Sequence, residues 1–97
     1  MAKYLVNENE IYNLDQVAKI YIKHIDPENY RGYVKPTEGE RTYPWRVMIK
    51  LVTEYPELLN MFKTESECRE FFDKICEFIA DTNDKQAFNT NVERVGL

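Results

Sequence analysis

The chain has 97 residues, of which 43% are hydrophobic and 31% charged, and its net charge is −4 at pH 7. This length supports one hydrophobic core but not a deep cleft between two domains. No apolar run approaches the roughly 18 residues that a membrane-spanning helix needs, and residues 1–6 lack the apolar region of a signal peptide. We therefore expect a single cytoplasmic domain that does not enter a membrane.

The chain opens with short segments typical of β-strands. Residues 3–6 form a β-type run, and Ile11–Asn13 can pair back on it across the polar residues 7–10. Residues 14–17 then predict a corner. This corner leads into the clearest strand of the chain, residues 18–25.

Two predicted strands alternate regularly enough for their faces to be assigned. In residues 18–25, Ile20 and Ile22 share one face, and the opposite face carries Lys19, Tyr21 and Lys23. In residues 45–53, the apolar set is Trp45, Val47, Ile49 and Leu51, and it alternates with Arg46, Met48, Lys50 and Val52. We expect the two apolar sets to form the inner face of a sheet.

The segment that joins these strands, residues 27–44, is long for a hairpin connection in a domain of this size. Either residues 30–34 add a strand or the segment is a functional or mobile loop. We favour a strand over residues 30–34 that extends the hairpin, followed by a mobile tip at residues 36–40.

Residues 54–57 predict a turn, and the segment after it, residues 58–62, is ambiguous. Pro56 can occupy the first position of a short helix, whereas the apolar residues that follow can equally form a closing strand. We favour the strand.

An amphipathic helix is predicted over residues 64–81, and it is the most clearly marked element of the chain. Thr64 is a suitable N-cap, and Glu67 completes a capping box, so the helix should begin at Glu65. One stripe of this helix is apolar and consists of Cys68, Phe71, Phe72, Ile75, Cys76 and Ile79. We expect that stripe to pack on the inner face of the sheet.

The chain has two cysteines, Cys68 and Cys76, and both fall on this predicted helix. They would lie about 12 Å apart along its axis, beyond the Cα separation of about 7 Å that a disulfide allows. No histidine or third cysteine is near them to complete a metal site. We expect both to be small, buried hydrophobic residues.

Together these elements predict an α+β fold. One antiparallel sheet of four to five strands in meander order would carry the C-terminal amphipathic helix on one face. Residues 1–81 would form the domain. The polar residues 82–97 would form a flexible tail, unless Phe88, Val92 and Val95 dock on the body or on a neighbour.

Two motifs resemble those of the short reading frames of Gram-positive bacteria and their phages. The segment IYNLDQV at residues 11–17, followed by Ile20 and Ile22, is similar to their "I-N-L-x-x-V, then I-x-I" opening. Phe62 and residues 64–67 are similar to their "F-x-S/T-x-x-E" helix start. The resemblance covers less than half of the chain and implies an antiparallel sheet with a C-terminal helix, encoded by a phage or other mobile element. Most of that class is uncharacterised, so it implies no functional residue.

The sequence offers little for catalysis. His24 is the single histidine, and no serine or cysteine has a plausible base beside it. The carboxylates cluster on a helix face without signs of a pocket, and the three glycines are isolated, so no phosphate-binding loop is present. We expect a protein that is not an enzyme and that uses no cofactor or metal.

Binding is the better-supported class, and we expect a small protein-interaction module, with self-association included. Aromatic and basic residues concentrate in residues 30–46, and Tyr, Trp and Arg dominate interface hot spots. The residues expected to be partly exposed and to face the partner are Tyr30, Arg31, Tyr43 and Arg46. They would lie beside the open face of the sheet, which carries Lys19, Tyr21, Lys23 and Lys50.

Two alternative functions would use other surfaces. The open face, with Lys19, Tyr21, Lys23, Arg46 and Lys50, would suit a single-stranded nucleic acid through phosphate contacts and base stacking. Residues 54–84 carry nine acidic and three basic side chains, which would suit an inhibitor of a host nucleic-acid enzyme, of the anti-CRISPR type. Simple solubility of a half-buried sheet explains the basic residues equally well.

Overall fold

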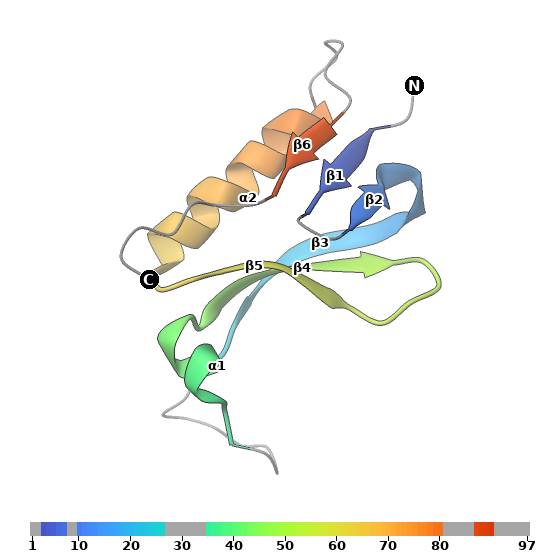
Figure 1. The fold of residues 1–97 in the computed structure, drawn as a ribbon. Helices are drawn as coiled ribbons and strands as arrows, with labels where there is room; N and C mark the ends of the chain where they lie inside the picture. Colours follow the sequence, from blue (N-terminus) through green and yellow to red (C-terminus); the bar gives the residue numbers. More distant parts are fainter. Residues whose placement is uncertain (1–2, 8–9, 27–34, 81–86, 91–97) are drawn as a thin grey trace.

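The computed structural model describes residues 3–7, 10–26, 35–80 and 87–90, and these form two three-stranded sheets and one long helix (Figure 1). The first sheet has the order β2-β1-β6 and consists of β1 (Tyr4–Val6), β2 (Ile11–Asn13) and β6 (Ala87–Asn89). The second has the order β3-β4-β5 and consists of β3 (Val17–His24), β4 (Trp45–Leu51) and β5 (Glu57–Phe62). The helical elements are the 3₁₀ turn η1 (Leu14–Gln16), α1 (Glu38–Thr42) and α2 (Glu65–Ala80).

The α+β class and the antiparallel meander β3-β4-β5 are confirmed, but the expectation of one continuous sheet is wrong. The chain turns at η1, where the Asn13 side chain accepts a hydrogen bond of 2.9 Å from the backbone N–H of Asp15. Because of this turn, β2 and β3 belong to different sheets. The strand over residues 58–62 is confirmed as part of β5.

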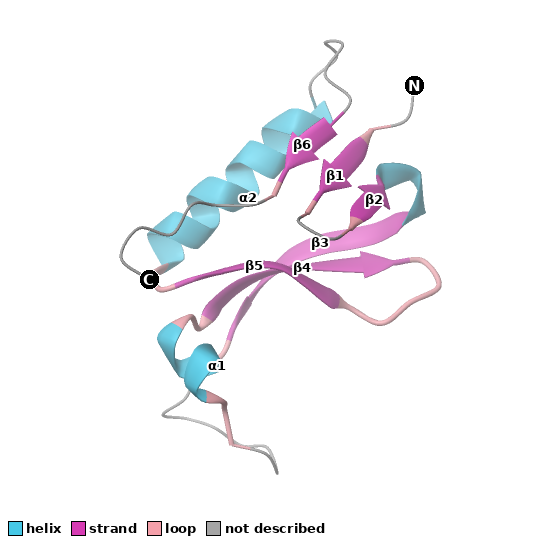
Figure 2. Cartoon of the chain, viewed as in Figure 1, coloured by secondary structure: helices cyan, strands magenta, loops and turns pink. Residues whose placement is uncertain are grey.

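The two sheets and α2 enclose one core. Figure 2 shows α2 and the β2-β1-β6 sheet on the same side of the β3-β4-β5 sheet, with α1 at the end of the sheet where β3 ends and β4 begins. Ile20 lies opposite Ile49 and Ile22 opposite Val47, so the predicted inner face of β3 and β4 is confirmed. The fully buried side chains come from both sheets and from α2, and they include Leu5, Val47, Ile49, Cys68 and Ile75.

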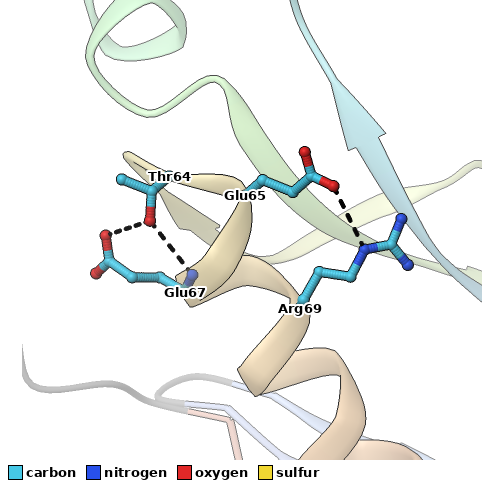
Figure 3. Close-up of polar contacts among 4 residues, drawn as sticks. All are labelled: Thr64, Glu65, Glu67 and Arg69. Atoms are coloured by element: carbon cyan, nitrogen blue, oxygen red, sulfur yellow. Dashed lines mark hydrogen bonds and ion pairs between the residues drawn. The ribbon is translucent and has the colours of Figure 1, made fainter.

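Helix α2 begins at Glu65, as the capping residues predict (Figure 3). The Thr64 hydroxyl oxygen accepts a hydrogen bond of 3.3 Å from the backbone N–H of Glu67, and the same hydroxyl donates one of 2.9 Å to the Glu67 carboxylate. The cap therefore satisfies one of the N–H groups that a helix start leaves without a partner. No helix in the described part of the chain is long and apolar enough to cross a membrane.

The buried face of α2 is rotated from the predicted stripe. Phe78, which the stripe omitted, is 6% exposed, whereas Ile79 is 46% exposed. Cys76 is also exposed, so only Cys68 fits the expectation of a buried cysteine. The reason is that β6 flanks the helix on the Phe78 side, where the rings of Phe78 and Phe88 lie 5.5 Å apart.

Strand β6 lies within the range expected to be a tail, and residues 87–90 dock on the body. Its backbone pairs in parallel with β1, with Phe88 opposite Leu5. Thr90 is fully buried; its N–H and its hydroxyl donate to the Val6 carbonyl at 2.7 and 3.1 Å, and its own carbonyl accepts from Asn60 at 2.8 Å. Val92 and Val95 lie outside the described residues.

The end of α2 is held by a residue from the start of the chain. The last turn of α2 contains no basic side chain of its own. Lys3 supplies one, because its Nζ donates a 2.7 Å hydrogen bond to the Phe78 carbonyl and lies 5.1 Å from the centre of the Phe78 ring. A cation at this position satisfies a terminal carbonyl and interacts favourably with the helix dipole.

The long connection between β3 and β4 contains an element that the sequence analysis missed. Residues 36–40, expected to be a mobile tip, include the start of α1. Thr37 caps this helix by a full capping box, in which its hydroxyl accepts from the Glu40 N–H and the Glu40 carboxylate accepts from the Thr37 N–H, both at 3.2 Å. The strand expected at residues 30–34 lies outside the described residues.

Phe71 should contribute more to stability than Phe72. Phe71 is 6% exposed and its ring lies 5.2 Å from that of Phe62, whereas Phe72 is only partly buried. Phe71→Ala should lower the free energy of unfolding by about 3–5 kcal/mol and Phe72→Ala by about 1–2 kcal/mol. Urea unfolding of the two variants measures the difference, and equal losses would contradict the rotated helix face.

Tyr12 links stability to alkaline pH. Its side chain is 4% exposed, and its hydroxyl donates a 3.0 Å hydrogen bond to the Glu57 carboxylate. Burial, and next this hydrogen bond, raise the pKa of Tyr12 above its ordinary value. The folded state therefore keeps a proton that the unfolded state loses, so this contribution to stability is complete below about pH 10 and is lost as the pH rises further.

Tyr12→Phe should flatten this pH dependence. At about pH 8 the variant should be less stable than the wild type by about 1 kcal/mol, because one hydrogen bond is lost. Towards about pH 11 the two unfolding midpoints should converge. Only the wild type loses stability in this range, because its Tyr12 ionises more readily in the unfolded state than in the folded state. Tyr55→Phe is the matched control, since Tyr55 is 92% exposed and should leave the profile unchanged. Parallel curves for wild type and Tyr12→Phe would show that Tyr12 does not set the dependence.

Candidate functional site

The side of the β3-β4-β5 sheet that faces away from α2 carries a cluster of basic side chains. Strand alternation places these residues on the face of the sheet that does not carry the buried Val47 and Ile49. The register aligns them in pairs across β3 and β4. Three cross-strand pairs result: Lys19 with Lys50, Tyr21 with Met48, and Lys23 with Arg46. We refer to these six residues as the open face.

Like charges lie directly opposite each other at both ends of the open face. The Lys19 and Lys50 pair and the Lys23 and Arg46 pair each bring two cations together, an arrangement that destabilises an antiparallel sheet. The ion pairs found in the described part of the chain involve Arg69 and Lys74 on α2 instead. The open face therefore holds four cations without an ion-pair partner among the described residues.

The centre of the open face is apolar. Met48 lies between Tyr21 on β3 and Leu58 on β5, and Met61 lies opposite Arg46. The Lys19 Nζ lies 4.8 Å from the centre of the Tyr21 ring, within the range of a cation–π contact. The surface thus combines an aromatic and sulfur-containing centre with charge at both ends.

The Arg46 side chain contacts a methionine on β5, and no carboxylate of the described residues forms an ion pair with it. Its Nη2 approaches the Met61 sulfur at 3.9 Å, a weak hydrogen bond. Its Nε is buried and has no hydrogen-bond partner among the described residues. A buried polar atom without a partner costs stability, so this contact of Arg46 does not itself stabilise the sheet.

Helix α1 brings one carboxylate towards this end of the face. The pKa of Glu40 is lowered, first by the hydrogen bond from the Thr37 backbone N–H and more weakly by the charges of Arg46 and Lys23. Glu40 therefore stays ionised and offsets part of the positive potential at the α1 end. The Lys19 and Lys50 end has no such neighbour on α1.

The other end of the open face adjoins an exposed turn between β4 and β5. A hollow of about 330 Å³ is lined there by Lys50, Val52, Thr53, Glu54 and Tyr55. Tyr55 is 92% exposed and Val52 61% exposed. The sequence pattern around Tyr55 predicts only a turn. The signal for an exposed binding residue is an aromatic side chain between Glu54 and Pro56, where no core position is predicted.

The structure brings together five of the eight residues expected to bind a partner, namely Lys19, Tyr21, Lys23, Arg46 and Lys50. Tyr43 was expected to be partly exposed, and this is wrong: it is 9% exposed, its N–H closes α1 on the Gly39 carbonyl at 2.9 Å, and the Lys63 Nζ lies 5.7 Å from its ring centre. Tyr30 and Arg31 lie outside the described residues.

The acidic side of α2, the alternative surface, is partly neutralised by its own helix. Arg69 lies 3.7 Å from the Glu65 carboxylate (Figure 3), and Lys74 lies 3.6 Å from that of Glu70. These pairs join residues four apart on exposed helix positions, where they contribute a few tenths of a kcal/mol. The helix therefore presents a mixed surface instead of a continuous line of free carboxylates.

The remaining reactive groups are dispersed. His24 stacks on Trp45, with ring centres 4.1 Å apart and planes inclined by 15°. Cys68 is enclosed in the core, and burial raises the pKa of its thiol, which makes it a poor nucleophile. Among the described residues, no three His, Cys, Asp or Glu side chains gather as a metal site requires.

Comparison of the chain with protein-family models, curated proteins and solved structures finds no match. The resemblance to the reading frames of Gram-positive bacteria and their phages therefore stays a prediction. The site has to be interpreted from its own geometry.

Lys50→Glu should stabilise the fold, because it converts a like-charge pair with Lys19 into an ion pair. A cross-strand ion pair contributes about 0.2–1 kcal/mol, which corresponds to a rise in melting temperature of about 1–5 °C for a domain of this size. Lys35→Glu is the matched control: it makes the same change in net charge at an exposed position outside the strands. A lower melting temperature for Lys50→Glu than for Lys35→Glu would contradict the assigned register.

Proposed function

We propose that this protein is a small, non-enzymatic protein-interaction module whose open face binds an acidic segment of a partner protein. The observation that carries the proposal is the pairing of like charges, Lys19 with Lys50 and Lys23 with Arg46, without an acid between them on the strands. An anionic partner would convert both repulsive pairs into attractive contacts. Binding would then recover free energy that the isolated fold gives up.

The spacing of the cations defines what such a partner must present. Lys23 lies four positions after Lys19 along β3, which corresponds to about 13 Å in a strand. A partner with acidic side chains at that spacing, and an apolar group between them over Tyr21 and Met48, would match both parts of the face. Met48 is partly exposed and can adapt to such a group, because its side chain is flexible and polarisable.

A protein partner fits this face better than a single-stranded nucleic acid does. Binding of single strands relies on aromatic rings that stay open for base stacking, and the Tyr21 ring has the Lys19 ammonium over it at 4.8 Å. Tyr55, 92% exposed beside Lys50, supplies the kind of residue that dominates protein interface hot spots.

The proposal is tested with a fluorescently labelled peptide of ten glutamates as the probe. The double variant Lys19→Gln and Lys23→Gln should bind it at least about tenfold more weakly at low salt, because two surface charge contacts are lost. The control, Lys35→Gln and Lys74→Gln, has the same net charge, and it should bind within about twofold of the wild type. Fluorescence anisotropy measures both affinities.

Equal weakening by the two double variants would show that only net charge matters and would remove the open face as the site. A labelled oligothymidylate of ten nucleotides is measured in parallel. If the wild type binds it more tightly than the peptide, and the open-face variant loses that binding, the partner is a nucleic acid and the protein-interaction function is wrong.

A further inference from the structure

An apolar groove runs between α2 and the start of β3. Its volume is about 300 Å³, and α2 contributes Phe72, Ile75, Cys76 and Ile79 to its lining. The β3 side contributes Leu14, Val17, Lys19 and Ile20. Ile79 is 46% exposed here and Cys76 is also exposed, so the rotation of α2 towards β6 leaves an apolar surface on this opposite side.

The strand beside this groove is an edge of its sheet. β3 pairs with β4 on one side, and no strand in the described part of the chain pairs with its other side. An edge strand offers a row of backbone N–H and C=O groups to any further strand. A groove between an edge strand and a helix is a geometry in which an extended peptide can add to the sheet and place every second side chain beneath the helix.

We propose that the partner segment binds as an extended strand added to the free edge of β3, with acidic and apolar residues in alternation. This inference rests on the proposed function and specifies the partner for it. Successive side chains of the added strand point to opposite faces of the sheet. Its apolar residues enter the groove beside Ile79 and Cys76, and its acidic residues lie on the open-face side beside Lys19 and Lys23.

Charge complementarity selects this occupant over a second copy of the chain. Two β3 strands paired edge to edge would place Lys19 and Lys23 of one copy on the same face as those of the other, and like charges across strands are destabilising. An acidic strand meets the same lysines with the opposite sign. Lys19 belongs both to the groove and to the open face, so one added strand contacts both surfaces.

The test compares two labelled peptides of nine residues. One alternates glutamate with valine, and the other has serine in place of each valine, so that the two share length and charge. The wild type should bind the glutamate–valine peptide at least about tenfold more tightly. In NMR titrations, that peptide should shift the backbone amides of β3 and of the groove side of α2 most strongly.

Ile79→Gln should remove most of the preference for valine, and Ile11→Gln is the matched control. Ile11 is 70% exposed on β2 and does not line the groove, so its replacement should leave both affinities within about twofold. Cys76→Gln provides a second groove variant at an exposed position, should Ile79→Gln lower the melting temperature. The Ile79 and Cys76 variants should bind the glutamate–serine peptide as the wild type does.

Equal binding of the two peptides by the wild type, or an unchanged preference in both groove variants, would overturn added-strand binding. The proposed function is affected only if the replacement of Lys19 and Lys23 by glutamine also leaves binding of decaglutamate unchanged. Amide shifts along the edge of β6 in place of β3 would likewise overturn the inference. Failure of added-strand binding can therefore be distinguished from failure of the proposed function.

Discussion

The fold depends on a cluster of four phenylalanine rings that joins β5, α2 and β6. Phe71 on α2 lies 5.2 Å from Phe62 on β5 and 6.4 Å from Phe88 on β6, and Phe88 lies 5.5 Å from Phe78. Through Phe88 the helix is tied to β6 and so to β1, which pairs with β6 in parallel. Aromatic pairs of this kind contribute beyond the area they bury, so the cluster fixes how α2 sits on the β3-β4-β5 sheet.

Among the described residues, α2 and the β2-β1-β6 sheet cover one face of the β3-β4-β5 sheet. The long helix α2 and the β2-β1-β6 sheet lie on the same side. On the other face of β3 and β4, Lys19 and Lys23 are exposed, and Arg46 and Lys50 are partly buried. Mixed charges would keep this face just as polar, and they would also stabilise the sheet, because opposite signs across strands attract. The structure instead has Lys19 opposite Lys50 and Lys23 opposite Arg46. A cost of that kind is expected at a binding surface, where local rules give way to function.

The parts of the fold that follow from local pattern could be predicted from the sequence. The alternation of apolar and polar residues in β3 and β4 correctly predicted that Val47 and Ile49 lie on the inner face. It also predicted that the cations of the open face lie together on the other face. The three-residue β6 could not be predicted, because its pairing with β1 is set by contacts far apart in the sequence and has no periodic signal. For the same reason the helix face was placed on Ile79 instead of Phe78, and Tyr43 was expected at the surface.

The rotation of α2 links the phenylalanine cluster to the proposed binding mode. Burying Phe78 against Phe88 turns Ile79 outwards, next to the edge of β3 with which no described strand pairs. A helix centred on the sheet would have covered that edge with the same apolar residues and closed the groove. Here the groove and the cations of the open face meet along one strand, with Lys19 contributing to both. The packing that stabilises one flank of the helix therefore also exposes the apolar surface that the proposed partner strand would cover.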